Sequence, residues 1–291
     1  FQKKKINFFS GVPDSCMNEF CNELSNHKNI DNIVAANEGS AVSLGIGYHL
    51  ATSKIPCVYM QNSGLGNATD PLTNLMSKSV YNIPMIILIG WRGAPSIKDE
   101  AQHDIQGRVL LDSLKLFEIK NIVISARYVR YLFKTGYDNG EGGKESDLED
   151  TYYYPDNYNG DKERMDIVLD AYKNSVKNLL LADKNIFLVY PVPENGWDVV
   201  RQSYKPFIKN NITTSYQSFL NRSKLVIEIF DELLIYNNFF KIDPSKLFCN
   251  VISPGRCETS INGELLYFDD DHVSNYGAKI IINEIFKQKI K

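Results

Sequence analysis

The chain has 291 residues, of which 43% are hydrophobic and 23% are charged. This profile is that of an ordinary globular protein, and it excludes a disordered or low-complexity chain. The 32 basic and 35 acidic residues give a net charge of −3, which excludes a general nucleic-acid binder. The densest apolar run, residues 83–91, has the length of a strand and not the roughly 20 residues of a spanning helix, so we expect no membrane span.

The first 118 residues alternate between helical and extended patterns. In chain order we expect a helix from residues 13–15, a strand at 30–36, a helix at 39–51, a strand at 56–60, a loop at 61–67, a helix from residue 71 and a strand at 84–90. Apolar strands that are separated by helices are typical of a parallel sheet covered on both faces. The fold class of this part is therefore α/β.

The pattern restarts after residue 120. We expect a strand at 122–125, an irregular polar stretch at 135–163, a helix at 163–181, a strand at 186–190, a helix at 223–234, a strand at 247–251 and a last helix after Ser274. This part is also α/β, with loops at the carboxyl ends of the strands, where such sheets bind ligands. We predict two partial α/β units, 1–119 and 120–291, each with parallel strands flanked by helices.

The five cysteines fall into two groups. Cys16 and Cys21 lie in the first expected helix and Cys57 in an apolar strand, where we expect buried free thiols, as in a cytosolic protein. Cys249 and Cys257 flank a Pro-Gly turn that could bring their sulfur atoms together, and a disulfide there would imply an oxidising compartment. For this pair, a disulfide and two free thiols are equally good interpretations.

Glu38 directly follows an expected buried strand and begins a helix rich in glycine and alanine. A carboxylate in an apolar pocket at the end of a strand is suited to proton exchange. Taken alone, a glutamate at this position is more often a cap that complements the helix dipole. The neighbouring motifs favour the first interpretation.

Six motifs follow one another in a fixed order in this part of the chain. They are residues 11–15, 35–41, 48–52, 59–67, 89–93 and 99–103. Together they resemble the pyrimidine-binding domain of phosphonopyruvate decarboxylase, a thiamine diphosphate enzyme, and that of its relative sulfopyruvate decarboxylase. The resemblance covers residues 5–118 and is specific, because six separate motifs agree in order and spacing.

The resemblance implies that Glu38 hydrogen-bonds the aminopyrimidine ring of thiamine diphosphate and activates it for decarboxylation of a 2-oxo acid such as phosphonopyruvate. It also implies that Asp14 and His103 transfer protons near the reacting atoms, a task that suits both residue types. Without the resemblance, Asp14 would be interpreted as a helix cap and His103 as a surface histidine.

The same resemblance implies a cofactor pocket lined by Gln61, Asn62 and Gly64 beside Glu38. Three basic residues could pair with a phosphonate or sulfonate group, although solvated surface charge is the more common explanation. They are Arg92, Lys98 and Arg108.

One part of the family's site has no counterpart in the sequence. Such enzymes bind magnesium and the diphosphate on a second domain with a Gly-Asp-Gly start and a downstream Asn, and no Gly-Asp-Gly occurs here. We therefore expect the N-terminal domain to be truncated and a diphosphate-binding partner chain or a second copy to complete the site. We predict no metal ligands in this chain.

Near the C-terminus, Asp269 and His272 are three residues apart in front of the last expected helix. This spacing can direct an imidazole and its orienting carboxylate toward one nucleophile. Alone it is a weak signal, because three consecutive aspartates before a helix are more often caps or a solvated turn.

The surroundings again resemble a known family. Residues 124–127, 135–143, 189–198, 249–257 and 269–272 are similar to the C-terminal SGNH domain of membrane acyltransferases that O-acetylate surface polysaccharides. The resemblance covers residues 121–291 and implies that His272 is a general base, that Asp269 orients it, and that the domain lies outside the cytoplasmic membrane. The family's nucleophile belongs to a Gly-Asp-Ser block, which this sequence does not contain.

We therefore predict a chain in which a decarboxylase-like part meets an SGNH-like part near residues 118–121, as in a fusion or a truncated gene product. The favoured function is half of a thiamine diphosphate decarboxylase site with a small 2-oxo acid as substrate. The alternatives are a fragment of a carbohydrate O-acyltransferase or esterase, and an inactive fusion product. The N-terminal half is expected in the cytoplasm, which we take for the whole chain, although the C-terminal half resembles an extracytoplasmic domain.

Overall fold

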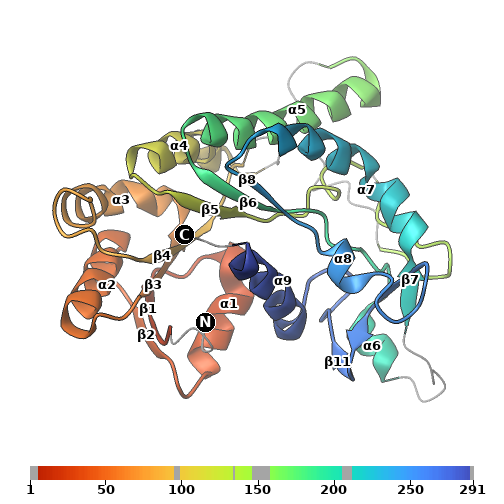
Figure 1. The fold of residues 1–291 in the computed structure, drawn as a ribbon, viewed down its shortest axis with the longest axis horizontal. Helices are drawn as coiled ribbons and strands as arrows, with labels where there is room; N and C mark the ends of the chain where they lie inside the picture. Colours follow the sequence, from red (N-terminus) through yellow and green to blue (C-terminus); the bar gives the residue numbers. More distant parts are fainter. Residues whose placement is uncertain (1–5, 95–98, 134, 146–157, 205–211, 289–291) are drawn as a thin grey trace. The chain divides into compact units, whose positions relative to one another are not determined.

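The computed structural model describes residues 6–94, 99–133, 135–145, 158–204 and 212–288. The chain divides into two compact units, which we call the N-terminal unit, ending at Ile119, and the C-terminal unit, beginning at Lys120. Both are built from parallel strands and helices, as predicted (Figure 1). Within the described ranges we find no helix that combines the length and the apolar character needed to cross a bilayer.

The N-terminal unit contains a four-stranded parallel sheet in the order β2-β1-β3-β4. Its strands are β1 (Phe8–Gly11), β2 (Asp31–Val34), β3 (Cys57–Gln61) and β4 (Ile86–Gly90). Across the sheet, the connection from β1 to β2 runs in one direction, and the connections from β2 to β3 and from β3 to β4 run in the opposite direction. Right-handed crossovers therefore place α1 (Asn18–Asn26) on one face of the sheet and both α2 (Glu38–Thr52) and α3 (Leu65–Asp70) on the opposite face.

Strand alternation distributes the side chains between these two faces. Phe9 and Tyr59 pack with Leu24 of α1, while the hydroxyl of Ser10 donates to the carbonyl of Ala41 in α2 at 2.7 Å. Met17, Phe20 and Cys21 also pack on this core. One expectation is wrong: β2 is an edge strand, and its Ile33 and Val34 are exposed.

Local structure in the N-terminal unit differs from the prediction at three places. The expected helix at 13–15 begins as the short 3₁₀ turn Ser15–Met17, and Cys16 in it is exposed instead of buried. The expected loop at 61–67 is helical, with a 3₁₀ turn at Asn62–Gly64 that leads directly into α3. Helix α4 (Ala101–Leu116) was not expected, because its polar face interrupts the apolar pattern.

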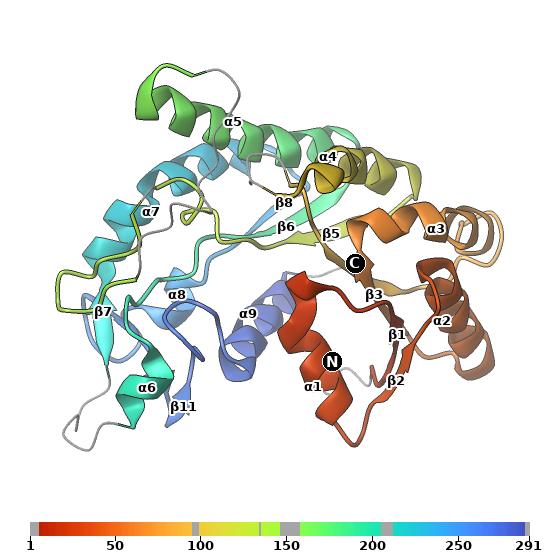
Figure 2. The same cartoon turned by 180° about the vertical axis from the view of Figure 1, so that it is seen from behind.

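The C-terminal unit contains a three-stranded parallel sheet in the order β5-β6-β8. Its strands are β5 (Asn121–Ile124), β6 (Asn185–Val189) and β8 (Phe239–Ile242). Both crossovers run in the same direction, so α5 (Gly160–Leu181) and α7 (Tyr216–Asp231) lie on one face, and α9 (Asn275–Lys287) covers the other (Figures 1 and 2). The helix expected after Ser274 is confirmed, with the Ser274 side chain accepting from the amide of Gly277.

The strand expected at 247–251 is wrong. Residues Ser245–Phe248 form the short helix α8, whose first turn is fixed by the Asp243 carboxylate, which accepts from both the amide and the hydroxyl of Ser245. The third strand is β8, where Lys241 breaks the apolar run. The structure accommodates this lysine, because its ammonium contacts Asp231 at 2.8 Å and lies over the ring of Tyr190.

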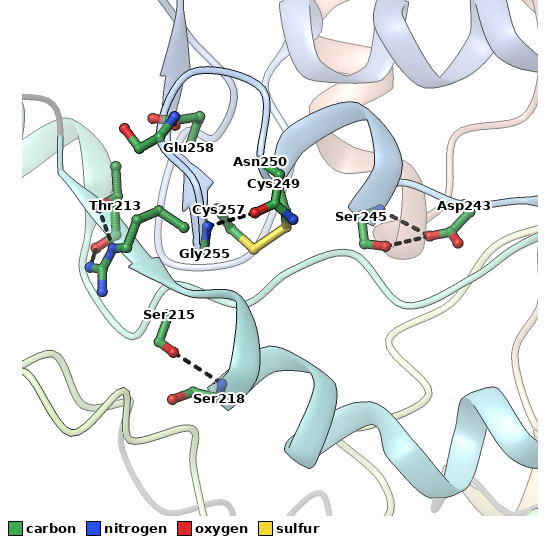
Figure 3. Close-up of a disulfide and its surroundings, with 12 residues drawn as sticks. Thr213, Ser215, Ser218, Asp243, Ser245, Cys249, Asn250, Gly255, Cys257 and Glu258 are labelled. Atoms are coloured by element: carbon green, nitrogen blue, oxygen red, sulfur yellow. Dashed lines mark hydrogen bonds between the residues drawn. A yellow bond between two sulfur atoms is a disulfide. The ribbon is translucent and has the colours of Figure 1, made fainter.

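The remaining elements form a small antiparallel region around a disulfide. Strand β7 (Thr213–Ser215) pairs with β9 (Arg256–Glu258), β10 (Ser260–Ile261) pairs with β11 (Glu264–Leu265), and α6 (Val199–Ser203) lies between β6 and β7 in sequence. Cys249 and Cys257 are bonded to each other (Figure 3). Cys16, Cys21 and Cys57 are free, and of these Cys57 is buried.

Candidate functional sites

In the N-terminal unit, Glu38 occupies the first position of α2, which Asn37 caps. Its Oε2 accepts a hydrogen bond of 2.7 Å from the side-chain amide of Asn67. A Cβ atom on Gly64 would lie 2.5 Å from the Glu38 Cδ and 2.6 Å from its Oε1, so a larger residue there would push this carboxylate aside. Glu38 is half-buried and hydrogen-bonded, instead of being enclosed in an apolar pocket after a buried strand.

Asp14 and Gln61 meet where the strand order of the sheet reverses. Asp14 follows β1 and Gln61 ends β3, and the Gln61 amide donates to the Asp14 carboxylate at 3.2 Å. Parallel sheets present ligand-binding residues at this kind of switch point. Gln61 also accepts from the Ser63 hydroxyl, and Asp14 caps the 3₁₀ turn by accepting from the amide of Cys16. The two side chains are therefore held in place within the unit.

Asn62 holds the chain after β4 and does not offer its side chain to a ligand. Its Nδ2 donates to the Arg92 carbonyl at 3.0 Å, and its Oδ1 accepts from the Arg92 amide at 2.9 Å. Asn62 is also buried. That Asn62 lines the cofactor pocket stays a prediction. Its backbone, and not its side chain, would then form part of the pocket wall.

Arg92, Asp99 and His103 form a closely packed polar group. Arg92 donates to both carboxylate oxygens of Asp99, from Nε at 2.8 Å and from Nη2 at 2.5 Å, and its Nη1 donates to the hydroxyl of Ser15. The Nδ1 of His103 is 2.9 Å from Asp99 Oδ1. The hydrogen bonds from Arg92, which outweigh the effect of burial, hold the pKa of Asp99 well below its usual range.

This geometry revises the expected anion ligands. The guanidinium of Arg92 is already paired with Asp99, so it is not a free partner for a phosphonate or sulfonate. Arg108 is exposed on α4, and Lys98 lies outside the described residues. The residues that the sequence prediction missed are Asn67 and Asp99. The spacing of four residues between Asp99 and His103 was an available signal for the second.

In the C-terminal unit, Asp269 and His272 contact each other directly. The Nδ1 of His272 is 2.7 Å from Asp269 Oδ2, and Asp269 Oδ1 accepts from the backbone amide of His272 at 2.7 Å. Burial opposes ionisation of Asp269, but these two hydrogen bonds prevail and lower its pKa. His272 is half exposed, and its ring stacks on Phe268.

A second carboxylate reaches the same imidazole. Asp271 Oδ1 is 3.0 Å from His272 Nδ1, and the guanidinium of Arg127 contacts the other oxygen of Asp271 and also Glu145. One oxygen or nitrogen from each of Asp269, Asp271 and His272 lies within a span that a metal ion could fill. Asp271, one of these three residues, is already engaged by the guanidinium of Arg127. Asp271 and Arg127 were missed from the sequence.

The loop after β6 supports this block. The amide of Asn195 and its side-chain nitrogen both donate to the carbonyl of Asp270, and the amide of Val199 donates to the carbonyl of Asp269. Asn139 in turn donates to the carbonyl of Asn195 at 2.8 Å. Residues 135–143, 189–198 and 269–272, which are far apart in sequence, therefore form one region of the C-terminal unit.

Fold and geometry together define an α/β chain with two groups of acid and base side chains at the carboxyl ends of parallel strands. The family model for the SGNH domain, described as fused to AT3 domains, matches residues 42–287. The chain therefore belongs to the SGNH domain family. The match extends upstream of residue 121, where the sequence resemblance was expected to begin.

Curated relatives show a second similarity. The chain is 35% identical over 111 residues to phosphonopyruvate decarboxylase from Streptomyces viridochromogenes, which is 38% of this chain and 27% of that protein. It is 33% identical over 97 residues to sulfopyruvate decarboxylase subunit alpha from Methanococcus maripaludis, covering 33% of this chain and 56% of that protein. The chain thus spans about a quarter to about half of the length of these relatives, and both predicted resemblances are confirmed.

Two solved structures are also similar. The periplasmic domain of a lipopolysaccharide acetyltransferase from Salmonella ser. Paratyphi A matches with a TM-score of 0.44 and 15% identity, covering 86% of this chain and 89% of that one. A putative thiamin diphosphate-dependent enzyme from Mycobacterium smegmatis matches with a TM-score of 0.32 and 19% identity, covering 46% of this chain and 26% of that one.

Proposed function

We propose that the N-terminal unit is the cofactor-activating half of a thiamine diphosphate decarboxylase site that acts on a small 2-oxo acid such as phosphonopyruvate. The observation that carries the proposal is the Glu38 carboxylate, held by Asn67 on one oxygen and packed against Gly64. Its Oε1 has no hydrogen-bond partner among the described residues and is able to accept from an N–H group of the cofactor. The similarity to phosphonopyruvate decarboxylase supports this assignment.

The residues present fit one end of the cofactor. Glu38 would hold the aminopyrimidine ring, and Gln61 and Gly64 would form the wall beside it. Bound thiamine diphosphate supplies the electron sink for the loss of carbon dioxide. Asp14, held by Gln61, and His103, held by Asp99, would hold or move protons next to the reacting carbon.

The other end of the cofactor needs a contribution from elsewhere. The sequence has no Gly-Asp-Gly motif for magnesium and the diphosphate. We propose that a partner chain of different sequence, which carries such a motif, completes the site. The name of the sulfopyruvate decarboxylase relatives, subunit alpha, is consistent with a site shared between subunits.

Calorimetric titration with thiamine diphosphate and magnesium tests the proposal. Even without the partner chain, we expect this chain to bind the aminopyrimidine end of the cofactor weakly. We expect Glu38→Gln to bind it at least tenfold more weakly still, about 1.4 kcal/mol, because glutamine keeps only one side-chain oxygen that accepts. Glu19→Gln, an exposed glutamate in the first turn of α1, is the matched control and should bind like the unaltered chain. Binding that is equal in Glu38→Gln, or no heat with any of the three proteins, would contradict the proposal.

We infer a second candidate function for the C-terminal unit, favoured by one observation. The imidazole of His272 contacts Asp269 through Nδ1, which leaves Nε2 to act as a base for acyl transfer. The unit would be part of a carbohydrate O-acyltransferase or esterase, although the sequence contains no Gly-Asp-Ser block to supply the family's nucleophile. Its disulfide supports an oxidising compartment outside the cytoplasm for this unit.

An activated acyl donor tests the second function. The chain is incubated with isotope-labelled p-nitrophenyl acetate, and labelled peptides are identified by mass spectrometry. We expect the acyl group on His272 or on a serine of the C-terminal unit, and its loss in Asp269→Asn. His27→Gln, an alteration in the N-terminal unit, should leave the labelling unchanged. Equal labelling of the unaltered chain and Asp269→Asn would count against a role for the pair.

A further inference from the structure

Asp99 is the centre of the polar group that contains His103. Its two carboxylate oxygens accept from four donors, which are Arg92 Nε and Nη2 and the backbone amides of Gly93 and Glu100. His103 Nδ1 lies 2.9 Å from Asp99 Oδ1. The side chains of Asp99 and His103 are 10% and 12% exposed. Solvent therefore competes little for these bonds, and the geometry of the imidazole is set by the carboxylate.

The donors around Asp99 determine which ring nitrogen of His103 carries the proton. The hydrogen bonds from Arg92 lower the pKa of Asp99, so the carboxylate is ionised and can only accept. His103 Nδ1 must then be the donor in the bond of 2.9 Å. When the imidazole is neutral, its single proton lies on Nδ1, and Nε2 carries a free lone pair.

Arg92 makes this arrangement neutral overall and rigid. Its charge balances that of Asp99, and its bond to Ser15 connects the group to the residue that follows Asp14. Gly93 has a φ of 63°, which favours glycine, and a Cβ on Gly107 would overlap the Gly93 carbonyl. The loop that carries Arg92 is therefore packed directly on α4, the helix that carries His103.

We propose that Asp99 is a positioning residue that fixes the tautomer of His103, so that Nε2 is the atom that exchanges protons with the substrate. The proton exchange with the substrate rests on the proposed decarboxylase function, whereas the tautomer of His103 is a property of the chain without cofactor. Arg92 fixes the position of the Asp99 carboxylate through two hydrogen bonds, and it does not bind the acid group of the substrate.

The test reads the tautomer directly by NMR. Histidine labelled with nitrogen-15 is incorporated, and long-range nitrogen–carbon-bound-proton spectra are recorded at pH 8 without cofactor. The chain has four histidines, and His103→Gln identifies the signals of the residue in question. We expect the Nδ1–H form to dominate at His103.

Two variants separate positioning from a general structural effect. In Asp99→Asn, the amide oxygen stays with Arg92 and the amide NH₂ faces His103, so we expect the proton to move to Nε2. Asp104→Asn removes an exposed acid of the first turn of α4 and is the control that should keep the Nδ1–H form. In Asp99→Glu, which restores a carboxylate, part of the Nδ1–H form should return.

The outcomes are distinct from those of the cofactor titration. A dominant Nε2–H form in the unaltered chain overturns the proposal, even if every variant fails to fold. An Nδ1–H form that persists in folded Asp99→Asn also overturns it. If thiamine diphosphate does not bind but the tautomer changes as expected, the proposed function fails and the positioning role of Asp99 stands.

Discussion

The candidate site of each unit contains one histidine, and the surroundings of these two histidines differ. In the N-terminal unit, His103 is nearly buried and bonded to one carboxylate, whose charge Arg92 balances. In the C-terminal unit, His272 is half exposed and lies within 3.0 Å of two carboxylates, Asp269 and Asp271. The first arrangement defines one geometry for the imidazole. The second leaves two acids in competition for one Nδ1 proton.

The two units also differ in the state of their cysteines. The N-terminal unit has three free thiols, and the C-terminal unit has one disulfide that closes the turn between α8 and β9. A covalent link therefore closes the small antiparallel region of the C-terminal unit, whereas packing holds the loops and helices of the N-terminal unit together.

The largest expected effect is on the packing of the Arg92 loop. In Gly107→Ala, the new methyl group overlaps the backbone of Gly93, so we expect the free energy of unfolding to fall by about 3 kcal/mol. Gly47→Ala, where a Cβ atom meets nothing within 4 Å, should raise stability slightly. Urea denaturation checks both, and a Gly107→Ala protein as stable as Gly47→Ala would show that the loop does not depend on this contact.

The disulfide should matter nearly as much. Cys249 and Cys257 are eight residues apart, and closing a loop of that length stabilises by about 2.5 kcal/mol through the entropy of the unfolded chain. We expect this loss in the double variant Cys249→Ser and Cys257→Ser, measured by thermal denaturation. Cys16→Ser alters an exposed free thiol and is the control. Equal stability of the double variant and the control would contradict the prediction.

The third prediction concerns Gly64, which packs against the side chain of Glu38. In Gly64→Ala, the methyl group forces the carboxylate aside, at a cost of about 2 kcal/mol in stability. Cofactor binding by the N-terminal unit should weaken at least as much as in Glu38→Gln. Gly66→Ala places a methyl group in open space two residues later, and it should change neither the stability nor the cofactor affinity. Calorimetry and urea denaturation of the two variants provide the comparison.

A pH dependence follows from Asp99. Its pKa is lower in the folded chain than in the unfolded chain, so the folded chain binds fewer protons. The stabilisation is complete above the unfolded value of about 3.9 and is lost as the pH falls below it. Asp99→Asn should therefore lower stability by about 1–2 kcal/mol at pH 7 and by progressively less toward pH 3. A destabilisation that is constant between pH 3 and pH 7 would refute this origin.

The smallest effect is expected at the exposed histidine. His272→Gln should change stability by less than about 0.5 kcal/mol, because its side chain is half exposed. His103→Gln, at a nearly buried site, should cost about 1 kcal/mol through the lost bond to Asp99. Thermal denaturation of the pair of variants measures the difference. The reverse order would mean that the Asp269 and His272 contact is the more important of the two for folding.

The sequence predicted the parts of this molecule that local chemistry controls. Ser274 marked the start of α9, because a serine that caps a helix acts on residues three positions away. The spacing of Asp269 and His272 likewise predicted a direct contact that a single turn produces.

The sequence failed where distant residues decide the outcome. Strand β8 was missed because the pairing of Lys241 with Asp231 and Tyr190 becomes visible only when the sheet is assembled. The role assigned to Arg92 as an anion ligand changed because Asp99 occupies its guanidinium. Asp271 was missed because its meaning depends on Arg127, more than a hundred residues earlier in the chain.

The most direct test of the central claim is hydrogen exchange of the full chain with and without thiamine diphosphate and magnesium. We expect the cofactor to slow exchange at the start of α2 and in residues 61–67, and Glu38→Gln to abolish this protection. Exchange that is unchanged by the cofactor, or protection that is equal in Glu38→Gln, would contradict the claim that Glu38 is part of a cofactor site.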